Sequence, residues 1–79
     1  MSNKTKYDKI LMDVLRVKEG ELPGLTYQSI QTWDSVGHMN MIEAIEDVFD
    51  IMMDTEDIVA LSSYEKGMEV LAKYGVNFE

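Results

Sequence analysis

The 79-residue chain has no cysteine, one proline and one histidine, and this composition limits the crosslinks and metal sites that it can form. Without cysteine it forms no disulfide and no cysteine-ligated metal site, so the packing of secondary structure must stabilise the fold. The single His38 cannot build a zinc site by itself. No apolar run approaches the ~20 residues of a membrane helix, and no leader-like segment opens the chain. We therefore expect a cytoplasmic protein with no membrane partner.

Positive charge is also scarce. The formal net charge is -8, and no Lys or Arg occurs between Lys18 and Lys66, a stretch that holds eleven Asp and Glu residues. Nucleic acid is bound through Lys and Arg, so a nucleic-acid partner is excluded. The acidic stretch favours basic protein partners, although a surface that only keeps the protein soluble would show the same charge.

The composition that remains is typical of a small globular protein, with 46% hydrophobic and 28% charged residues. The length allows one domain, residues 1–79, with a thin core. Helical spacing of apolar residues predicts helices at about 4–17, 35–49 and 62–74, and a short one at 55–60. Residues 18–34 have the composition of a loop, and its expected anchors are Leu25, Tyr27, Ile30 and Trp33. The fold class expected is all-α, a compact four-helix bundle of three main helices and one short helix with a long first loop.

The helix at 35–49 carries the clearest pattern. Either Asp34 or Ser35 can cap its first turn. Its apolar arc is expected in the core, and its opposite side is acidic. The expected core residues are Met41, Ile42, Ala44, Ile45, Val48 and Phe49; the opposite side holds Asn40, Glu43, Glu46 and Asp47. Val36 and Met39 fall beside the acidic residues, as an exposed apolar spot next to the Ser35 hydroxyl.

Catalysis by this chain itself is disfavoured. His38 falls at a helical position close to core residues, which predicts a partly buried packing residue and not a base for Ser35. The carboxylates lie on an exposed face with nothing to raise a pKa. The segment from Asp50 to Asp57 is rich in oxygen ligands but lacks the order of a calcium loop. We expect no catalytic residue and no dedicated metal site, with weak surface binding of divalent cations left open.

The segment Trp-Asp-Ser-Val-Gly-His-Met, residues 33–39, resembles the signature of the acyl carrier protein family, an Asp-Ser pair and an aliphatic residue at the start of the second helix. The residues that follow keep the spacing of the family, and the whole chain has its length. The matching residues are Met41, Ile42, the run Ala44 to Glu46, and the run Val48 to Asp50.

The resemblance implies a carrier role. A phosphopantetheinyl transferase would join Ser35, preceded by Asp34, to a 4'-phosphopantetheine arm taken from coenzyme A, and the thiol of the arm would carry an acyl group as a thioester. The pathway would be fatty-acid synthesis or a specialised acyl or polyketide pathway. Two alternatives stay open: an aminoacyl carrier of the peptidyl or D-alanyl kind, and an unmodified acidic helical interaction module in which Ser35 is only a cap.

The resemblance also implies roles for other residues. Synthase and acyl-transferring enzymes with basic patches would dock on a face that has Asp34 at its edge and consists of Val36, Met39, Glu43, Glu46 and Asp47. An acyl-chain pocket would be lined by Ile42, Ile45, Phe49, Ile58 and Leu71, and the chain is expected to be a monomer. Three positions depart from the family pattern: Gly37 replaces an acidic residue, Asp54 a proline, and Glu43 a methionine. Bulk fatty-acid synthesis and a specialised pathway are therefore equally open.

Overall fold

The computed structural model describes residues 2–78 and contains, in this range, four α-helices and no β-strand. The helices are α1 (Asn3–Leu15), α2 (Ser35–Phe49), α3 (Thr55–Ala60) and α4 (Tyr64–Ala72), and a 3₁₀ turn, η1 (Glu19–Glu21), lies in the long first loop. The predicted fold class, a small helical bundle with three main helices and one short helix, is confirmed. None of the described helices is long and apolar enough to cross a membrane.

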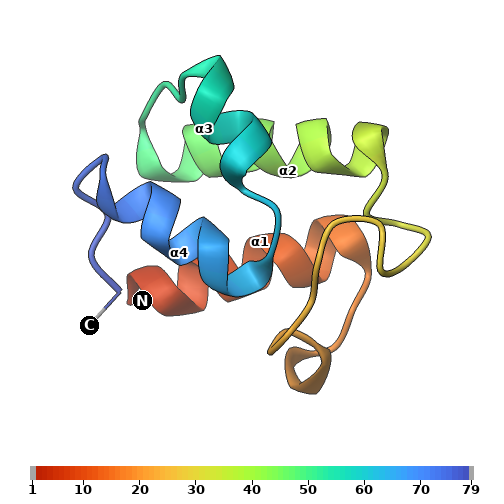
Figure 1. Ribbon diagram of the computed structural model, residues 1–79. Helices are drawn as coiled ribbons and strands as arrows, with labels where there is room; N and C mark the ends of the chain where they lie inside the picture. The colour runs from red at the N-terminus through yellow and green to blue at the C-terminus, as the bar shows by residue number, and fades with distance from the viewer. Residues whose placement is uncertain (1, 79) are drawn as a thin grey trace.

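Helices α1 and α2 lie side by side and run in opposite directions, with α4 between them in the view of Figure 1 and α3 above. The two ends of the described chain meet, because the Asn3 side chain donates a hydrogen bond to the Asn77 carbonyl over 2.9 Å. The apolar faces of the helices and the loop anchors enclose one core. Its buried residues are Tyr7, Ile10, Leu11, Leu15, Leu22, Leu25, Trp33, Met41, Ile42, Ile45, Met53, Leu61, Tyr64, Val70, Leu71 and Val76.

A buried polar network joins α1 to α4. The Tyr7 hydroxyl donates to the Tyr64 carbonyl over 2.8 Å, and the Tyr64 hydroxyl donates to Asp8 over 2.6 Å. Lys4 completes the network with an ammonium 2.8 Å from Asp8. Desolvation by burial, which disfavours the phenolate form, raises the pKa of Tyr7 and Tyr64. Each buried polar group thus has a partner, which removes the usual cost of burying it.

Gly67 lies where α4 crosses this network. A methyl group at its Cα would fall 2.0 Å from the Tyr7 hydroxyl oxygen, so no larger residue fits. From the sequence, Gly67 only weakened the prediction of a helix by about 1 kcal/mol of propensity. The structure gives it a positive role, because it lets α4 approach α1 closely.

The helix boundaries agree with the prediction at α2 and differ from it at α1 and α4. Helix α2 begins at Ser35 and ends at Phe49, as predicted, because Asp34 caps its first turn. The predicted end of α1 at residue 17 is wrong, because Arg16 adopts a left-handed conformation with φ 58° and ends the helix. The predicted start of the last helix at residue 62 is also wrong. Ser63 forms a β-bridge with Thr26, which keeps this segment extended, and α4 begins at Tyr64.

One expectation about the core is wrong. Val48 is 46% exposed, since the apolar arc of α2 is wider than the face that its neighbours cover. Of the expected loop anchors, Leu25 and Trp33 are buried and Ile30 is half-buried. Tyr27 is 37% exposed, and its ring contacts those of Trp33 and His38 edge to face.

Candidate functional site

Ser35 is the first residue of the fifteen-residue helix α2, and it is exposed. Asp34 caps the helix: its carboxylate accepts a hydrogen bond from the Gly37 N–H over 2.8 Å. The N–H groups of Ser35 and Val36 donate no hydrogen bond to any residue that the structure describes, as is usual in a first helical turn. The site therefore offers an accessible hydroxyl next to two backbone donors at the positive end of a helix.

Residues 32–38 form a compact unit around this serine, which we refer to as the clamp. The Thr32 hydroxyl donates to the Leu15 carbonyl at the end of α1 over 2.6 Å, and Trp33 is completely buried. The Thr32 carbonyl lies so close to Gly37 that a Cβ there would be only 2.0 Å from its oxygen. This close approach explains why the chain has glycine at position 37.

His38 connects the clamp to α3. The indole N–H of Trp33 donates to His38 Nδ1 over 3.0 Å, and His38 Nε2 lies 2.7 Å from the carbonyl oxygen of Ile58. The imidazole ring lies beside the indole of Trp33 and nearly parallel to it, with an interplanar angle of 16°, and it meets the ring of Tyr27 edge to face. His38 is half-buried, as predicted, and both of its nitrogens have partners in the fold, so neither is directed at the Ser35 hydroxyl as a base.

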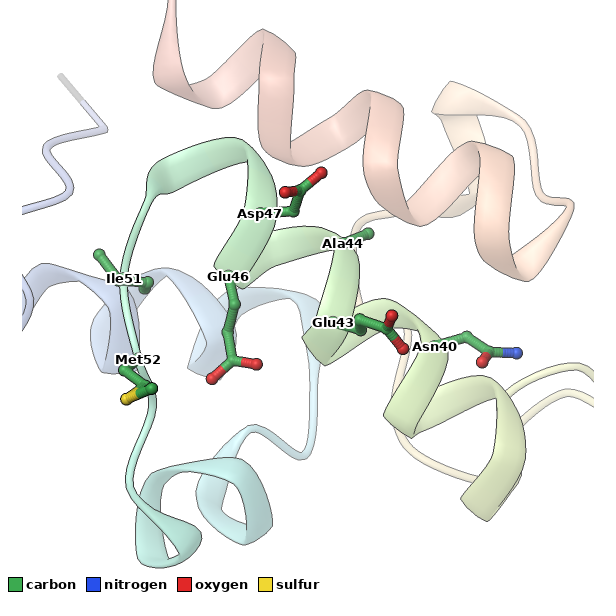
Figure 2. Close-up of a pocket in the computed structure, with 7 residues that line it drawn as sticks. All are labelled: Asn40, Glu43, Ala44, Glu46, Asp47, Ile51 and Met52. Atoms are coloured by element: carbon green, nitrogen blue, oxygen red, sulfur yellow. The ribbon is translucent and has the colours of Figure 1, made fainter.

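The carboxylates predicted on the acidic side of α2 differ in their exposure and in their hydrogen bonds. Glu43 and Asp47 are exposed, whereas Glu46 is half-buried and accepts a hydrogen bond from the Met53 N–H over 2.8 Å. Figure 2 shows the Glu46 side chain turned toward the segment that carries Met52. Glu46 thus has a structural task, holding the α2–α3 connection, in addition to its charge.

These residues border a shallow hollow of about 720 Å³, which Figure 2 displays. Its lining residues are Asn40, Glu43, Ala44, Glu46, Asp47, Ile51 and Met52. Val36 and Met39, predicted as an exposed apolar spot, are 67% and 52% exposed. Sequence reasoning missed Met52, which is 86% exposed, because it lies outside any periodic segment.

The five residues predicted to shelter an acyl chain are packed within the helices. Ile42, Ile45 and Leu71 are at most 1% exposed, and Phe49 and Ile58 are half-buried against the core. The hollow shown in Figure 2 does not reach any of them. A chain that entered between them would have to move a helix first.

Helix α3 is tied to the two residues that directly follow α4 by a charged cluster that the sequence did not reveal. Asp57 is buried, and its carboxylate accepts hydrogen bonds from the Lys73 ammonium, over 2.6 Å, and from the Tyr74 hydroxyl. These donors lower the pKa of Asp57, Lys73 most strongly, while Asp57 raises the pKa of both Lys73 and Tyr74. The Tyr74 oxygen in turn accepts from the Asp54 N–H over 3.0 Å, so Asp54 starts α3 without using its own side chain.

The residues that the structure describes contain no group of three or more His, Cys, Asp or Glu side chains placed to hold a metal ion. Comparison of the chain with protein-family models, with curated proteins and with solved structures finds no match. The interpretation of the site therefore depends on its geometry and on the residues themselves.

Proposed function

We propose that this chain is a carrier protein without catalytic activity of its own, and that Ser35 holds a 4'-phosphopantetheine arm whose thiol carries acyl groups as thioesters. The observation on which the proposal depends is the position of Ser35: exposed, on the first residue of α2, and supported by the clamp. In the modification, the Ser35 oxygen forms a bond to the phosphorus of coenzyme A that bears the arm. The bond from that phosphorus to the nucleotide breaks, and the hydroxyl proton leaves with the help of the transferase.

The residues around Ser35 fit a phosphodiester. The arm would place a negative charge beside the Ser35 and Val36 N–H groups, at the positive end of the helix macrodipole. This arrangement stabilises an anion by about 0.5–1 kcal/mol. The Asp34 carboxylate already accepts a hydrogen bond from Gly37, so it leaves the other two donors to the phosphate.

The surface next to Ser35 fits enzymes that present basic patches. Val36 and Met39 supply an apolar contact, and Glu43 and Asp47 supply exposed negative charge along the same helix. A field of one sign speeds association with positively charged partners, and salt weakens it. The partners proposed are a phosphopantetheinyl transferase and the acyl-transferring and synthase enzymes of a fatty-acid pathway or a specialised acyl pathway.

The test is an intact-mass spectrum after incubation with coenzyme A, magnesium and a broad-specificity phosphopantetheinyl transferase. We expect the gain of one arm in the natural chain and in Ser62→Ala, a matched control at another exposed serine. Ser35→Ala should gain none while keeping its helical circular dichroism. A folded natural chain that takes no arm would overturn the proposal and leave an acidic interaction module, with the hollow of Figure 2 as its surface.

A further inference from the structure

Helix α3 is held in place by its neighbours. Its six residues are too few to form a stable helix alone. Asp57 ties it to α4 through Lys73 and Tyr74, and His38 ties it to α2 through the Ile58 carbonyl. The His38 contact is the one side-chain hydrogen bond between α2 and α3 among the residues that the structure describes.

The direction of the His38 hydrogen bonds follows from the chemistry of the indole. A Trp N–H is only a donor, so His38 Nδ1 accepts from Trp33, and the ring proton must reside on Nε2. Nε2–H then donates to Ile58. Because Trp33 is completely buried in the clamp, it fixes the tautomer that makes the bond to α3.

The apolar side chains that an acyl chain would have to reach belong to the core. Ile42 and Ile45 of α2 are at most 1% exposed, and Ile58 of α3, whose carbonyl accepts the His38 hydrogen bond, packs against the same core. Access requires α3 to move, and moving it breaks the bond from His38 to Ile58. The free energy needed to break that hydrogen bond is the same for every acyl group. The favourable free energy of burying an acyl chain, in contrast, increases with each methylene.

We propose that His38 is a specificity-determining residue: it latches α3 to α2 and thereby sets the shortest acyl chain that enters the helix core. The inference rests on the carrier function proposed above. Acyl groups below this length stay outside the core, exposed to partner enzymes, and longer ones displace α3 and are sheltered. Weakening the latch lowers the threshold length.

The test loads Ser35 with acetyl, butyryl, hexanoyl, octanoyl and decanoyl arms and records the methyl NMR shifts of Ile42, Ile45 and Leu71. In the natural chain these shifts should begin to change at a chain about two methylenes longer than in His38→Ala. His38→Gln should restore the natural threshold, since an amide side chain can accept from Trp33 and donate to Ile58. Equal thresholds in the natural chain and His38→Ala, or no change with any chain, would overturn the proposal.

Two further measurements keep this test separate from the carrier function. Amide hydrogen exchange of the unmodified protein needs no arm: His38→Ala should expose the amides of α3 while those of α1 stay protected, and unchanged α3 protection contradicts the latch. Failure of the natural chain to take any arm refutes the carrier function instead.

A second variant is available if His38→Ala does not fold. Trp33→Phe no longer fixes the tautomer of His38, so it must lower the threshold length. An unchanged threshold length in Trp33→Phe contradicts the latch.

Discussion

His38 joins the clamp to α3, and the two are held in different ways. The clamp is fixed by crowding: Trp33 is completely buried, and the Thr32 carbonyl lies against Gly37 with no room for a side chain. Helix α3 is fixed by polar ties at its edges, to His38, Lys73 and Tyr74. Packing of the first kind resists movement, whereas a few hydrogen bonds open locally at low cost. The serine thus has a rigid support on one side and a movable neighbour on the other.

The largest loss of stability is expected from Gly37→Ala, which adds a methyl group where Gly37 lies against the Thr32 carbonyl. A Cβ at 37 would lie 2.0 Å from a backbone oxygen that cannot turn aside. Overpacking of this kind costs about 3 kcal/mol, and the better helix propensity of alanine returns about 1 kcal/mol. We expect a net loss of about 2 kcal/mol in the free energy of unfolding, measured in urea. The control is Gly20→Ala, where no atom lies within 4 Å; equal stability of the two variants would contradict the crowding.

Trp33→Phe tests both parts of the comparison at once, because it weakens the packing of the clamp and the hydrogen bond from His38 to α3. The smaller ring leaves a space in the core, and His38 Nδ1 loses its donor. We expect a loss of about 1.5 kcal/mol in the free energy of unfolding. Tyr27→Phe, at a residue 37% exposed, should change it by less than about 0.5 kcal/mol. An equal loss in the two variants would show that the buried indole has no special role.

Acid should loosen α3. The pKa of Asp57 is lowered in the folded state by Lys73 and Tyr74. Its contribution to stability is therefore complete above its unfolded pKa of about 4 and is lost as the pH falls through the lower folded value. Proton NMR between about pH 5 and pH 2 should show the α3 amides shifting as Asp57 takes up its proton.

The matched variants for the acid experiment are Asp57→Asn and Asp47→Asn. The first removes the carboxylate that Lys73 and Tyr74 hold, and the second removes an exposed one. Asp57→Asn should loosen α3 already at neutral pH and abolish its separate acid transition, whereas Asp47→Asn should retain it. Retention of that transition in Asp57→Asn would assign it to another group.

The smallest effect on stability is expected from Val36→Ser, because this side chain of the clamp is exposed and takes no part in the packing of Trp33 or Gly37. Its side chain is 67% exposed, so the free energy of unfolding should change by less than about 0.5 kcal/mol. If Val36 contacts the transferase, kcat/KM for modification of Ser35 should fall about tenfold. Val48→Ser, at an exposed valine further along the same helix, serves as the control. Equal rates for both variants would remove Val36 from the docking surface.

The sequence predicted best where one local interaction decides the structure. The Asp34 cap placed the start of α2 at the correct residue. The start of α4 was misplaced because the bridge between Thr26 and Ser63 joins segments far apart in the chain. A helical repeat describes only one helix, so it does not show which neighbours cover Val48.

The same limit applies to the candidate site. The exposed Ser35 and the flanking Val36 and Met39 could be predicted, because they depend on one helix. The roles of Gly37 and Gly67 could not, because a glycine that permits close approach has the same sequence signature as one that weakens a helix. From the sequence, Asp57 was only the end of a segment rich in oxygen ligands, and the proximity of Lys73 and Tyr74 shows why it is buried.

The burial of Trp33 has a practical consequence. It is the only tryptophan of the chain, its ring is shielded from solvent, and its N–H is bonded to His38. The fluorescence of the natural protein therefore comes mainly from one indole whose surroundings change when His38 shifts or when α3 departs. Emission wavelength and lifetime report on the environment of Ser35 without any label, and stopped-flow mixing with a transferase can follow the site in real time.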